Sequence, residues 1–482
     1  METKSNQLSV YTLDNLKPEV VAVAFAKCSR SPESFRDIAD ELTDEKSADF
    51  HEKWVVGYGH GSVAEHANLH LAIENISILA TKTIEDNRLC SYTEKSTRYQ
   101  VFDKTKYYKP KKIMESPLGA EYEKTMDEIF DVYSSLNAPM KEFILKKYPR
   151  QPEENEKIYN ATIKARVCDN VRYILPTATL TNLGMTANAR ALEHAIAKLL
   201  SHPLIEMNEI GEAIKKSAME ITPTLIKYAE KNKYIQETDE VLKKLNDNLT
   251  QQYTDAVSPV EIVDYDKDAE DKLATALLYK NSDLPYKQIM SAVKLMNGEQ
   301  KEKIIDEAIA RRGKGDQPPR EFEHIYYTFD ILMDYGAFRD IQRHRMCTQT
   351  NQKITIKHGF EIPEEIIEVG LEEIFKQTMK KAESLYKKIH IVFPEEAQYI
   401  LPLAFRKRTL ITWNLRELHH FISLRSGPKG HISYRRIAQA CWKKLNEIHP
   451  LLAKHINVNM TGGSDSWAST LYNPKYNYKP SK

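Results

Sequence analysis

Residues 340–345 read Asp-Ile-Gln-Arg-His-Arg and close a largely apolar, aromatic segment that begins at Ile325. Like charges packed this closely repel one another, and the apolar lead-in indicates a partly buried location. The local structure is therefore expected to present these side chains to an anion such as a phosphate, or to an electron-rich ring. An isolated Arg-His-Arg is more often a solvated turn, so a binding role for this stretch depends on the motifs around it.

Related patterns occur earlier in the chain. Phe322-Glu323-His324 lies about twenty residues before it, a spacing that is read directly from the sequence. The first half of the chain contains His60-Gly-Ser-Val-Ala-Glu-His66 and, further on, Glu94-x-Ser96-x-Arg98. These are the residue types that bind phosphates and heterocyclic rings.

Together these motifs resemble the flavin-dependent thymidylate synthases. That family carries Arg-His-Arg, seven arbitrary residues and a serine, with a Glu-His pair upstream. In the second half of this chain the position due for serine is Lys353. In the first half Arg-His-Arg has become Asp86-Asn87-Arg88, whereas Glu94-x-Ser96-x-Arg98 is whole.

A second landmark also occurs twice. Residues 171–176, Val-Arg-Tyr-Ile-Leu-Pro, precede Asn188-Ala-Arg190, and residues 397–402, Ala-Gln-Tyr-Ile-Leu-Pro, precede Asn414-Leu-Arg416. The chain is therefore interpreted as an internal duplication. The resemblance implies an α+β protein made of two tandem copies of the family fold, each helix-rich with a mixed or antiparallel sheet. We expect copy one at 1–245 with an insertion at about 102–151, a linker at 246–259, copy two at 260–460, and a C-terminal arm at 461–482.

What each copy lacks is complementary. In the family the nucleotide site lies between two subunits, and copy two retains the contributions of one subunit as Arg343 and Arg425. Copy one retains those of the other as Glu94, Ser96, Arg98 and Arg172. The expectation is one composite site per chain. The reciprocal site would be formed by the remaining residues, which are Asp86, Leu199, Lys353 and Gln398.

The chemistry of these side chains suits a nucleotide. Planar arginines neutralise a phosphate with paired hydrogen bonds that lysine cannot copy, and Arg98, Arg172 and Arg343 are the candidates. A guanidinium that faces the carbonyl edge of a pyrimidine stabilises its anionic form, a role assigned to Arg425 as the catalytic residue. Ser96 is expected to donate a hydrogen bond rather than act as a nucleophile. The complete substrate-binding set is Asp340, Arg343, Glu94, Lys95, Ser96, Thr97, Arg98 and Arg172.

The resemblance also implies the cofactors. FAD is expected, with NADPH and methylenetetrahydrofolate as co-substrates, and no metal is assigned. The candidate FAD residues are Ser62, Arg343, His344, Arg345, Glu94, Asn188, Arg190, Asn414 and Arg416. Ser62 with Glu65 also fits a capping box at the start of a helix, and an Asn-x-Arg on a helix is commonly an amide cap and an ion partner.

Composition limits the class of protein. A net charge of +1 argues against a general nucleic-acid binder. No apolar run reaches about eighteen residues and no signal peptide is recognised, so neither a membrane nor secretion is implied. Five cysteines without close pairing fit a reducing cytoplasm. The resemblance further implies a homodimer that imitates the family's four subunits.

The coarse pattern predicts mostly helix, with long candidates at 118–147, 188–231, 269–298, 362–392 and 432–452. The two copies are each expected to open with a strand, at 8–13 and at 260–265.

Three other functions compete with thymidylate synthesis. Asp340 replaces a family amide, so another pyrimidine nucleotide, for instance a cytidylate, is an alternative substrate. The broken signatures favour a non-catalytic flavin- or nucleotide-binding scaffold. A metal hydrolase ranks last; its candidate ligands are His60, His66, His70, His419, His420 and His431. His66 and His70 have helical spacing, but no glutamate lies between them as a zinc protease requires.

Overall fold

The computed structural model describes residues 8–13, 16–57, 60–103, 105–247, 258–313 and 315–461, without the side chains of residues 56 and 247. They form two compact units: unit 1 draws on residues 1–95 and 180–253, and unit 2 on residues 96–179 and 254–482. The segment 96–179, which precedes the middle of the chain, therefore packs with the second half. Most of the expected linker and all of the expected C-terminal arm after Thr461 lie outside the described residues.

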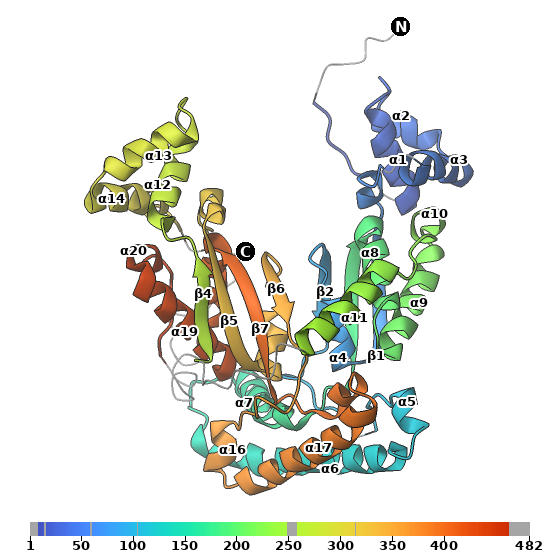
Figure 1. Ribbon diagram of the computed structural model, residues 1–482, viewed down its shortest axis with the longest axis vertical. Helices are drawn as coiled ribbons and strands as arrows, with labels where there is room; N and C mark the ends of the chain where they lie inside the picture. Colours follow the sequence, from blue (N-terminus) through green and yellow to red (C-terminus); the bar gives the residue numbers. More distant parts are fainter. Residues whose placement is uncertain are drawn as a thin grey trace. The chain divides into compact units, whose positions relative to one another are not determined.

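Unit 1 is built on a three-stranded antiparallel sheet of order β1-β3-β2 (Figure 1). Its strands are β1 Asn68–Ser77, β2 Cys90–Glu94 and β3 Leu180–Asn188. A bulge interrupts the pairing of β1 between Ile73 and Ile76. Asn75, inside this bulge, has a φ of 56°, a left-handed conformation that asparagine tolerates better than most residues.

The helices of unit 1 begin at side-chain caps in several places. Ser77 accepts from the backbone amide of Ala80 at 2.9 Å to start α4, and Asn188 caps α8 in the same way. The remaining helices cover the sheet or extend from it. Their bounds are α1 Pro18–Cys28, α2 Phe35–Asp40, α3 Asp44–Phe50, α4 Ile78–Ile84, α8 Ala189–Leu200, α9 Ile205–Met219, α10 Pro223–Ile226 and α11 Lys233–Asp247.

Unit 2 contains a four-stranded antiparallel sheet of order β4-β5-β7-β6. Its strands are β4 Val260–Tyr265, β5 Tyr326–Asp334, β6 Cys347–Asn351 and β7 Arg406–Asn414. Alternate residues of β5 and β7 are buried, which gives the period of two expected for a sheet with one face on a core. Phe329 and Trp413 pack edge to face within this core.

The strands pair in the same register within each of the two sheets. Cys90 of β2 pairs with Ala187 of β3, and Cys347 of β6 pairs with Trp413 of β7. By this pairing β1 corresponds to β5, β2 to β6 and β3 to β7. In each sheet a short helix joins the first two of these strands: α4 joins β1 to β2, and α15 joins β5 to β6. The sheet of unit 2 differs by its additional edge strand, β4.

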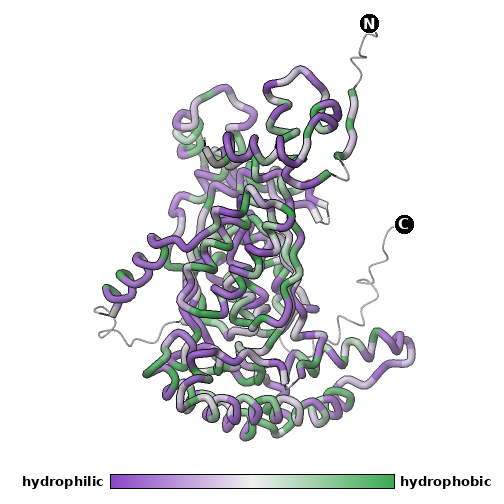
Figure 2. The backbone as a smooth tube through the Cα atoms, turned by 90° about the vertical axis from the view of Figure 1, so that its right-hand side faces the viewer, coloured by the Kyte–Doolittle hydropathy of each residue, from purple (hydrophilic) through white to green (hydrophobic). Residues whose placement is uncertain are grey.

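The helices of unit 2 include two long amphipathic ones, α6 Gly119–Lys147 and α17 Glu372–Val392, which pack against each other. Figure 2 shows hydrophobic and hydrophilic residues alternating along the helices at its lower edge, as burial of one face requires. The expected insertion, 102–151, contains α6. The other helices are α5 Lys111–Met114, α7 Glu156–Val171, α12 Ala269–Tyr279, α13 Tyr286–Leu295, α14 Gly298–Ile309, α15 Tyr335–Ile341, α16 Glu364–Glu368, α18 Leu415–Arg425, α19 Ile432–Ile448 and α20 Pro450–Ala453.

The two Tyr-Ile-Leu-Pro segments pair with each other inside unit 2. Thr177 N–H donates to Leu401 O at 2.9 Å, and reciprocally Leu403 N–H donates to Leu175 O at 2.9 Å. A bridge joins Pro176 to Pro402 at the centre of this pairing. Equivalent residues exchange equivalent bonds, which is the pattern of a two-fold axis between like subunits.

The α+β class is confirmed, and three local predictions are wrong. Residues 8–13 form no strand, whereas 260–265 do. Ser62 makes no side-chain cap, and the segment after it is a 3-10 turn, Val63–His66, that leads into strand β1 instead of a helix. The apolar residues of 67–77 alternate with the period of a strand, so this segment forms a strand although the capping pattern before it predicted a helix.

The long helix predicted at 118–147 is confirmed as α6. The other four long candidates are broken into shorter helices by turns. Proline accounts for two of the breaks, because Pro223 and Pro450 each occupy a first helical position and restart the helix there.

Candidate functional site

A bidentate salt bridge holds Arg98 in unit 2. Its Nε and Nη2 donate to the two carboxylate oxygens of Asp169 at 2.7 and 2.8 Å. A third nitrogen, Nη1, lies 3.3 Å from the hydroxyl of Tyr434. Burial alone would lower the pKa of Arg98, but the carboxylate of Asp169 raises it above its ordinary value. Arg98 is therefore a fixed cation with a defined orientation.

Arg172 lies close to the same group and is almost fully buried. Its Nη1 is 3.8 Å from Oδ2 of Asp340, whereas its Nε and Nη2 have no hydrogen-bond partner among the described residues. Burial disfavours the charge, and Asp169 and Asp340 keep the pKa of Arg172 above its ordinary value. A buried guanidinium with open donors is costly, and such donors commonly serve a ligand.

Arg425, at the end of α18, completes the cluster. Its Nε donates to Nε2 of His344 at 2.9 Å, and its Nη2 donates to the backbone oxygen of Asp340 at 2.6 Å. Nη1 faces the Asp340 carboxylate at 3.9 Å, and the guanidinium carbon lies 5.3 Å from the centre of the Tyr434 ring. Burial lowers the pKa of Arg425. The carboxylate of Asp340 thus stands between Arg172 and Arg425 without a close bond to either guanidinium.

The other basic residues of the 340–345 stretch differ in exposure. The side chain of Arg343 is exposed, His344 is buried, and Arg345 is intermediate. Thr97 is buried and its hydroxyl accepts from Nη1 of Arg339 at 2.9 Å, while the hydroxyl of Ser96 accepts from the backbone amide of Arg98 at 3.2 Å. Ser96, Thr97, Arg98, Arg172, Asp340, Arg343, His344, Arg345 and Arg425 all belong to unit 2.

Five of the predicted residues belong to unit 1, because the boundary between the units falls after Lys95. Glu94 is half-buried, accepts from Lys82 at 3.0 Å, and also accepts from the hydroxyl of Thr81 at 3.1 Å. Arg190 forms an ion pair with Glu65. The set in unit 1 is Ser62, Glu94, Lys95, Asn188 and Arg190.

The asparagine and arginine of both Asn-x-Arg motifs have structural partners. Asn414 caps α18 by accepting from the amide of Glu417 at 2.8 Å. Arg416 donates to the backbone oxygen of Pro318 at 2.7 Å and pairs with Glu323 at 3.0 Å. The amide cap and the ion partner are therefore both present at these positions.

The substitutions in the second half also have local partners. Lys353, which stands where the family has serine, forms an ion pair with Glu395 at 2.6 Å. The side-chain amide of Gln398 donates to the backbone oxygen of Glu395 at 3.1 Å. Both side chains are thus held by the same glutamate residue.

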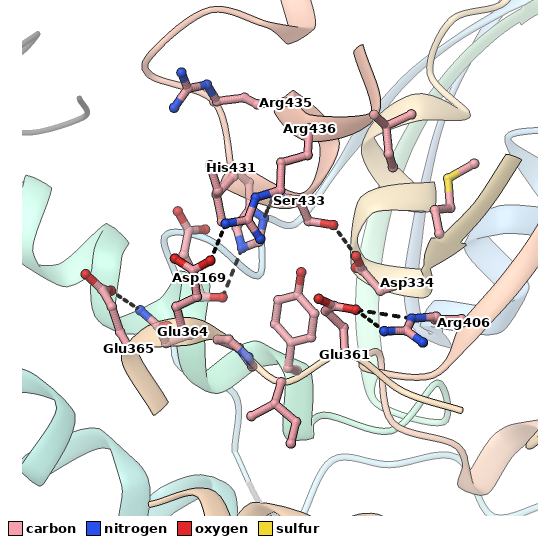
Figure 3. Close-up of a pocket in the computed structure, with 18 of the residues that line it drawn as sticks. Asp169, Asp334, Glu361, Glu364, Glu365, Arg406, His431, Ser433, Arg435 and Arg436 are labelled. Carbon is pink, nitrogen blue, oxygen red and sulfur yellow. Dashed lines mark hydrogen bonds and ion pairs between the residues drawn. The ribbon is translucent and has the colours of Figure 1, made fainter. Parts of the chain in front are cut away.

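A cavity of about 460 Å³ lies in unit 2 (Figure 3). Asp169 and His431 line it, and Asp169 is also the carboxylate that holds Arg98. Ion pairs Glu361–Arg406 and Glu364–Arg436 flank it. The lining residues are mixed in charge and include several apolar side chains, so the cavity offers both hydrogen bonds and a hydrophobic wall.

His431 is neutral in this wall. Its Nδ1 accepts from the amide of Ser433, and its Nε2 lies 3.2 Å from the backbone oxygen of Asp169. Burial lowers the pKa of His431 to about 3. Asp334, buried nearby, accepts from Ser433, and burial raises its pKa.

Ser62 lines a separate cavity of about 540 Å³ inside unit 1. His60 and His66 of the same motif also line it, as does Trp54, over which the guanidinium of Arg30 lies at 4.6 Å from the ring centre. An aromatic wall with a cation beside it suits a planar ring that carries negative charge.

The sequence did not indicate Asp169, Tyr434 or Glu417, and it indicated His431 only as a candidate metal ligand of the hydrolase alternative. Asp169 lies one helical turn before Arg172 at the end of α7, and this spacing was the only available signal. Tyr434 and His431 sit more than 300 and 250 residues away in the chain from their partners Arg98 and Asp169, so no local pattern connects them.

His66 and His70, the pair with helical spacing in the hydrolase alternative, do not share a helix face. His66 ends a 3-10 turn and His70 lies in β1, where its Nδ1 contacts the hydroxyl of Thr186 at 2.9 Å. Within the described residues no cluster of three or more His, Cys, Asp or Glu side chains has metal-binding geometry. Over the same residues no helix combines the length and apolar character needed to cross a membrane.

The fold is α+β, and the arginine cluster is a candidate site for an anion. The model of the thymidylate synthase complementing protein family matches residues 10–224 and 261–451 of this chain. The chain therefore belongs to the flavin-dependent thymidylate synthase family.

Relatives fall into two groups. A UPF0159 protein of Chlamydia pneumoniae is 34% identical over 477 residues, which cover 92% of this chain and 90% of that protein. A flavin-dependent thymidylate synthase of Sulfurisphaera tokodaii is 30% identical and covers 50% of this chain and 86% of that protein. A solved flavin-dependent thymidylate synthase from Helicobacter pylori, complexed with FAD and dUMP, covers 42% of this chain at 18% identity and a TM-score of 0.32.

Proposed function

We propose that the chain is an FAD-dependent thymidylate synthase that transfers a methylene from methylenetetrahydrofolate to carbon-5 of dUMP. The observation that carries this proposal is the cluster in unit 2, where Arg98 and Arg172 from the first half meet Arg425 from the second. Two charges of a phosphate and a developing anion on a pyrimidine need such a set of fixed cations.

Each arginine has a distinct part in this proposal. Arg98, fixed by Asp169, and Arg172, with two open buried donors, would bind the phosphate and the base. Arg343 is exposed and has no charged partner among the described residues, so it is available to the phosphate. Arg425 would face the ring and stabilise negative charge on its carbonyl edge, which increases electron density at carbon-5.

The residues available in this chain fit a flavin. The cavity of unit 1 joins Ser62 and His60 to an aromatic wall and the guanidinium of Arg30, which suits a ring system with a pyrophosphate. Arg343, Arg345 and Arg416 are the candidates in unit 2. When bound, FAD would supply the hydride that reduces the transferred methylene, and NADPH is the proposed reductant of the flavin. The chain's own contribution is to bind and orient.

The proposal includes an internal duplication with one competent site per chain. The shared strand register and the reciprocal bonds between 173–178 and 399–404 support the duplication. By the same resemblance we propose a cytoplasmic homodimer in which two chains supply the four family domains. The domain limits 1–245 and 260–460 describe the two copies in sequence, whereas the compact units group residues 96–179 with the second copy.

The test is the stoichiometry of dUMP binding and the product formed. Calorimetric titration of the purified chain with dUMP should give one site per chain, and incubation with FAD, NADPH and methylenetetrahydrofolate should yield thymidylate. Two equivalent sites per chain would refute the composite arrangement. A protein that binds dUMP but forms no product would instead favour the binding scaffold.

A second candidate substrate is a cytidylate, and the position of Asp340 favours it. Its carboxylate is an acceptor that faces the space between Arg172 and Arg425, at 3.8 and 3.9 Å. An acceptor there suits a base edge that donates, such as the exocyclic amine of cytosine. Competition between dUMP and dCMP with isotope-labelled folate separates the two, because label found only in a cytosine product would exclude thymidylate synthesis.

A further inference from the structure

Glu417, His344 and Arg425 form a continuous line of hydrogen bonds in unit 2. Nδ1 of His344 lies 2.8 Å from Oε1 of Glu417, and Nε2 of the same ring accepts from Nε of Arg425 at 2.9 Å. The side chain of His344 is 3% exposed, and those of Glu417 and Arg425 are each 12% exposed. The line therefore operates largely out of water, where hydrogen bonds of this kind are strongest.

The chemistry of the three groups fixes the protonation of the ring. A guanidinium has donors only, so Nε2 of His344 must carry the lone pair. The ring proton is then on Nδ1, where the carboxylate of Glu417 accepts it. This carboxylate–histidine arrangement selects one tautomer and one ring orientation, as it does where histidine binds a metal.

The ring in turn fixes Arg425. An arginine side chain loses about 2 kcal/mol of rotamer entropy when it is immobilised. Here Nε is held by His344 and Nη2 by the backbone oxygen of Asp340, while Nη1 keeps a distance of 3.9 Å from the nearest carboxylate. Two edges of the guanidinium are thus anchored before any ligand binds.

The first half of the chain shows what happens where the line is absent. By the shared strand register, the positions of His344, Glu417 and Arg425 correspond to Asn87, Ala191 and Leu199. Asn87 instead donates to the backbone oxygen of Ile84, and Leu199 is buried in the core of unit 1. All three members differ together, as expected if they serve one purpose.

We propose that Glu417 is a positioning residue, which holds Arg425 ready for the pyrimidine by setting the tautomer of His344. The proposal rests on the proposed function for its catalytic consequence, but its structural part stands alone. Glu417 also occupies the first turn of α18, after the cap Asn414, where a negative charge stabilises a helix. A test must therefore separate positioning from helix stability.

The experiment compares Glu417→Gln and Glu417→Leu in the full chain. The amide oxygen of glutamine still accepts from Nδ1, whereas leucine cannot. We expect kcat with dUMP to fall roughly tenfold to a hundredfold in Glu417→Leu, the range for loss of a supporting carboxylate. The Michaelis constant for dUMP should change little, and Glu417→Gln should retain most of the activity although it also loses the charge at the helix start.

A second measurement does not depend on activity. Nitrogen-15 NMR of histidine-labelled chain, assigned with His344→Gln, should show an unprotonated Nε2 and a protonated Nδ1 in the wild type. That pattern should be lost in Glu417→Leu and kept in Glu417→Gln. A protonated Nε2 in the wild type, or equal kcat in both variants of an active enzyme, would overturn the proposal. If no nucleotide is methylated, the proposed function fails while the tautomer still decides the positioning.

Discussion

The turn after α4 in unit 1 and the turn after α15 in unit 2 have similar surrounding elements, but their side chains differ in charge and in hydrogen-bond partners. Both helices start from a side-chain cap, Ser77 in one and Asp334 in the other, and both turns lead into a strand that begins with cysteine. In unit 2 the turn carries His344 and its bonds to Glu417 and Arg425.

In unit 1 the equivalent turn carries Asp86, which pairs with Lys198, and Asn87. Charged and polar groups there satisfy one another within the unit. In unit 2 the buried Arg172 retains donors that have no partner among the described residues. The comparison teaches that equivalent turns of one fold can either neutralise their charges with internal ion pairs or leave a cation with unsatisfied donors. Only the second arrangement is suited to bind an anion.

The largest effect should come from removing Arg425, a cation whose equivalent position in the first half is Leu199. Arg425→Ala should lower kcat with dUMP by about a hundredfold to a thousandfold, because a fixed donor to the developing anion is lost. Steady-state kinetics measure this effect. The matched control is Leu199→Met, at the equivalent position of the first half, which should leave kcat within about twofold because its volume is conserved. Equal losses in the two variants would remove the functional difference between the halves.

The starts of α19 and α9, which follow α18 and α8 in the chain, should respond differently to acid. Helix α19 starts at His431, whose pKa is lowered by burial to about 3, whereas α9 starts after Leu204, which does not titrate. Below its ordinary pKa of 6.5 the unfolded chain binds a proton on His431 that the folded chain does not. The stability due to this residue is therefore present at neutral pH and is lost as the pH falls towards about 3.

Each unit of pH in this window costs about 1.4 kcal/mol of stability for one such group. His431→Asn, which can still cap the helix, should show a smaller loss of unfolding free energy between pH 6.5 and pH 4.5 than the wild type. Urea unfolding at each pH measures the difference. An identical slope in both proteins would show that His431 is already charged in the native state.

A smaller effect is expected from weakening the paired bond between Arg98 and Asp169. Arg98→Lys keeps the charge but replaces two bonds, at 2.7 and 2.8 Å, with a single point contact. The dissociation constant for dUMP should rise about tenfold, or about 1.4 kcal/mol. Calorimetry provides the value, and Arg150→Lys at an exposed position of the same unit serves as the control. An unchanged constant would exclude Arg98 from the nucleotide site.

The smallest effect concerns the bulge that distinguishes β1 from β5. Asn75 has a φ of 56°, so Asn75→Ala should destabilise the chain by about 1 kcal/mol, whereas Asn75→Gly should change stability by only a few tenths. Denaturant unfolding compares the two variants. If alanine and glycine are equivalent there, the bulge relaxes and places no constraint on the backbone.

Part of the fold was predictable because it depends on local patterns. The long helix α6 and the strand β4 follow from periodicity. The duplication predicted from the repeated Tyr-Ile-Leu-Pro and Asn-x-Arg motifs stays a prediction. The strand at 8–13 was wrong, since the apolar residues Leu8 and Val10 are exposed and have no partner strand among the described residues. A short strand needs a neighbour, which its own sequence cannot supply.

The arginines were identified from the sequence because their residue type is tied to phosphate chemistry and their positions are tied to motifs. Their partners were not. Asp169, Tyr434 and Glu417 are ordinary polar residues, and their significance comes from distances to Arg98 and His344.

By itself, the sequence determined the family resemblance and the set of candidate cations, because these follow from residue types at fixed spacings, and the resemblance in turn implied the α+β class. The tertiary structure alone decided which cations are neutralised and which keep open donors. It grouped Ser96 to Thr179 with the second half and placed Asp340 between Arg172 and Arg425. Charge balance in a buried site depends on distance and burial in space, and residues far apart in the chain set both.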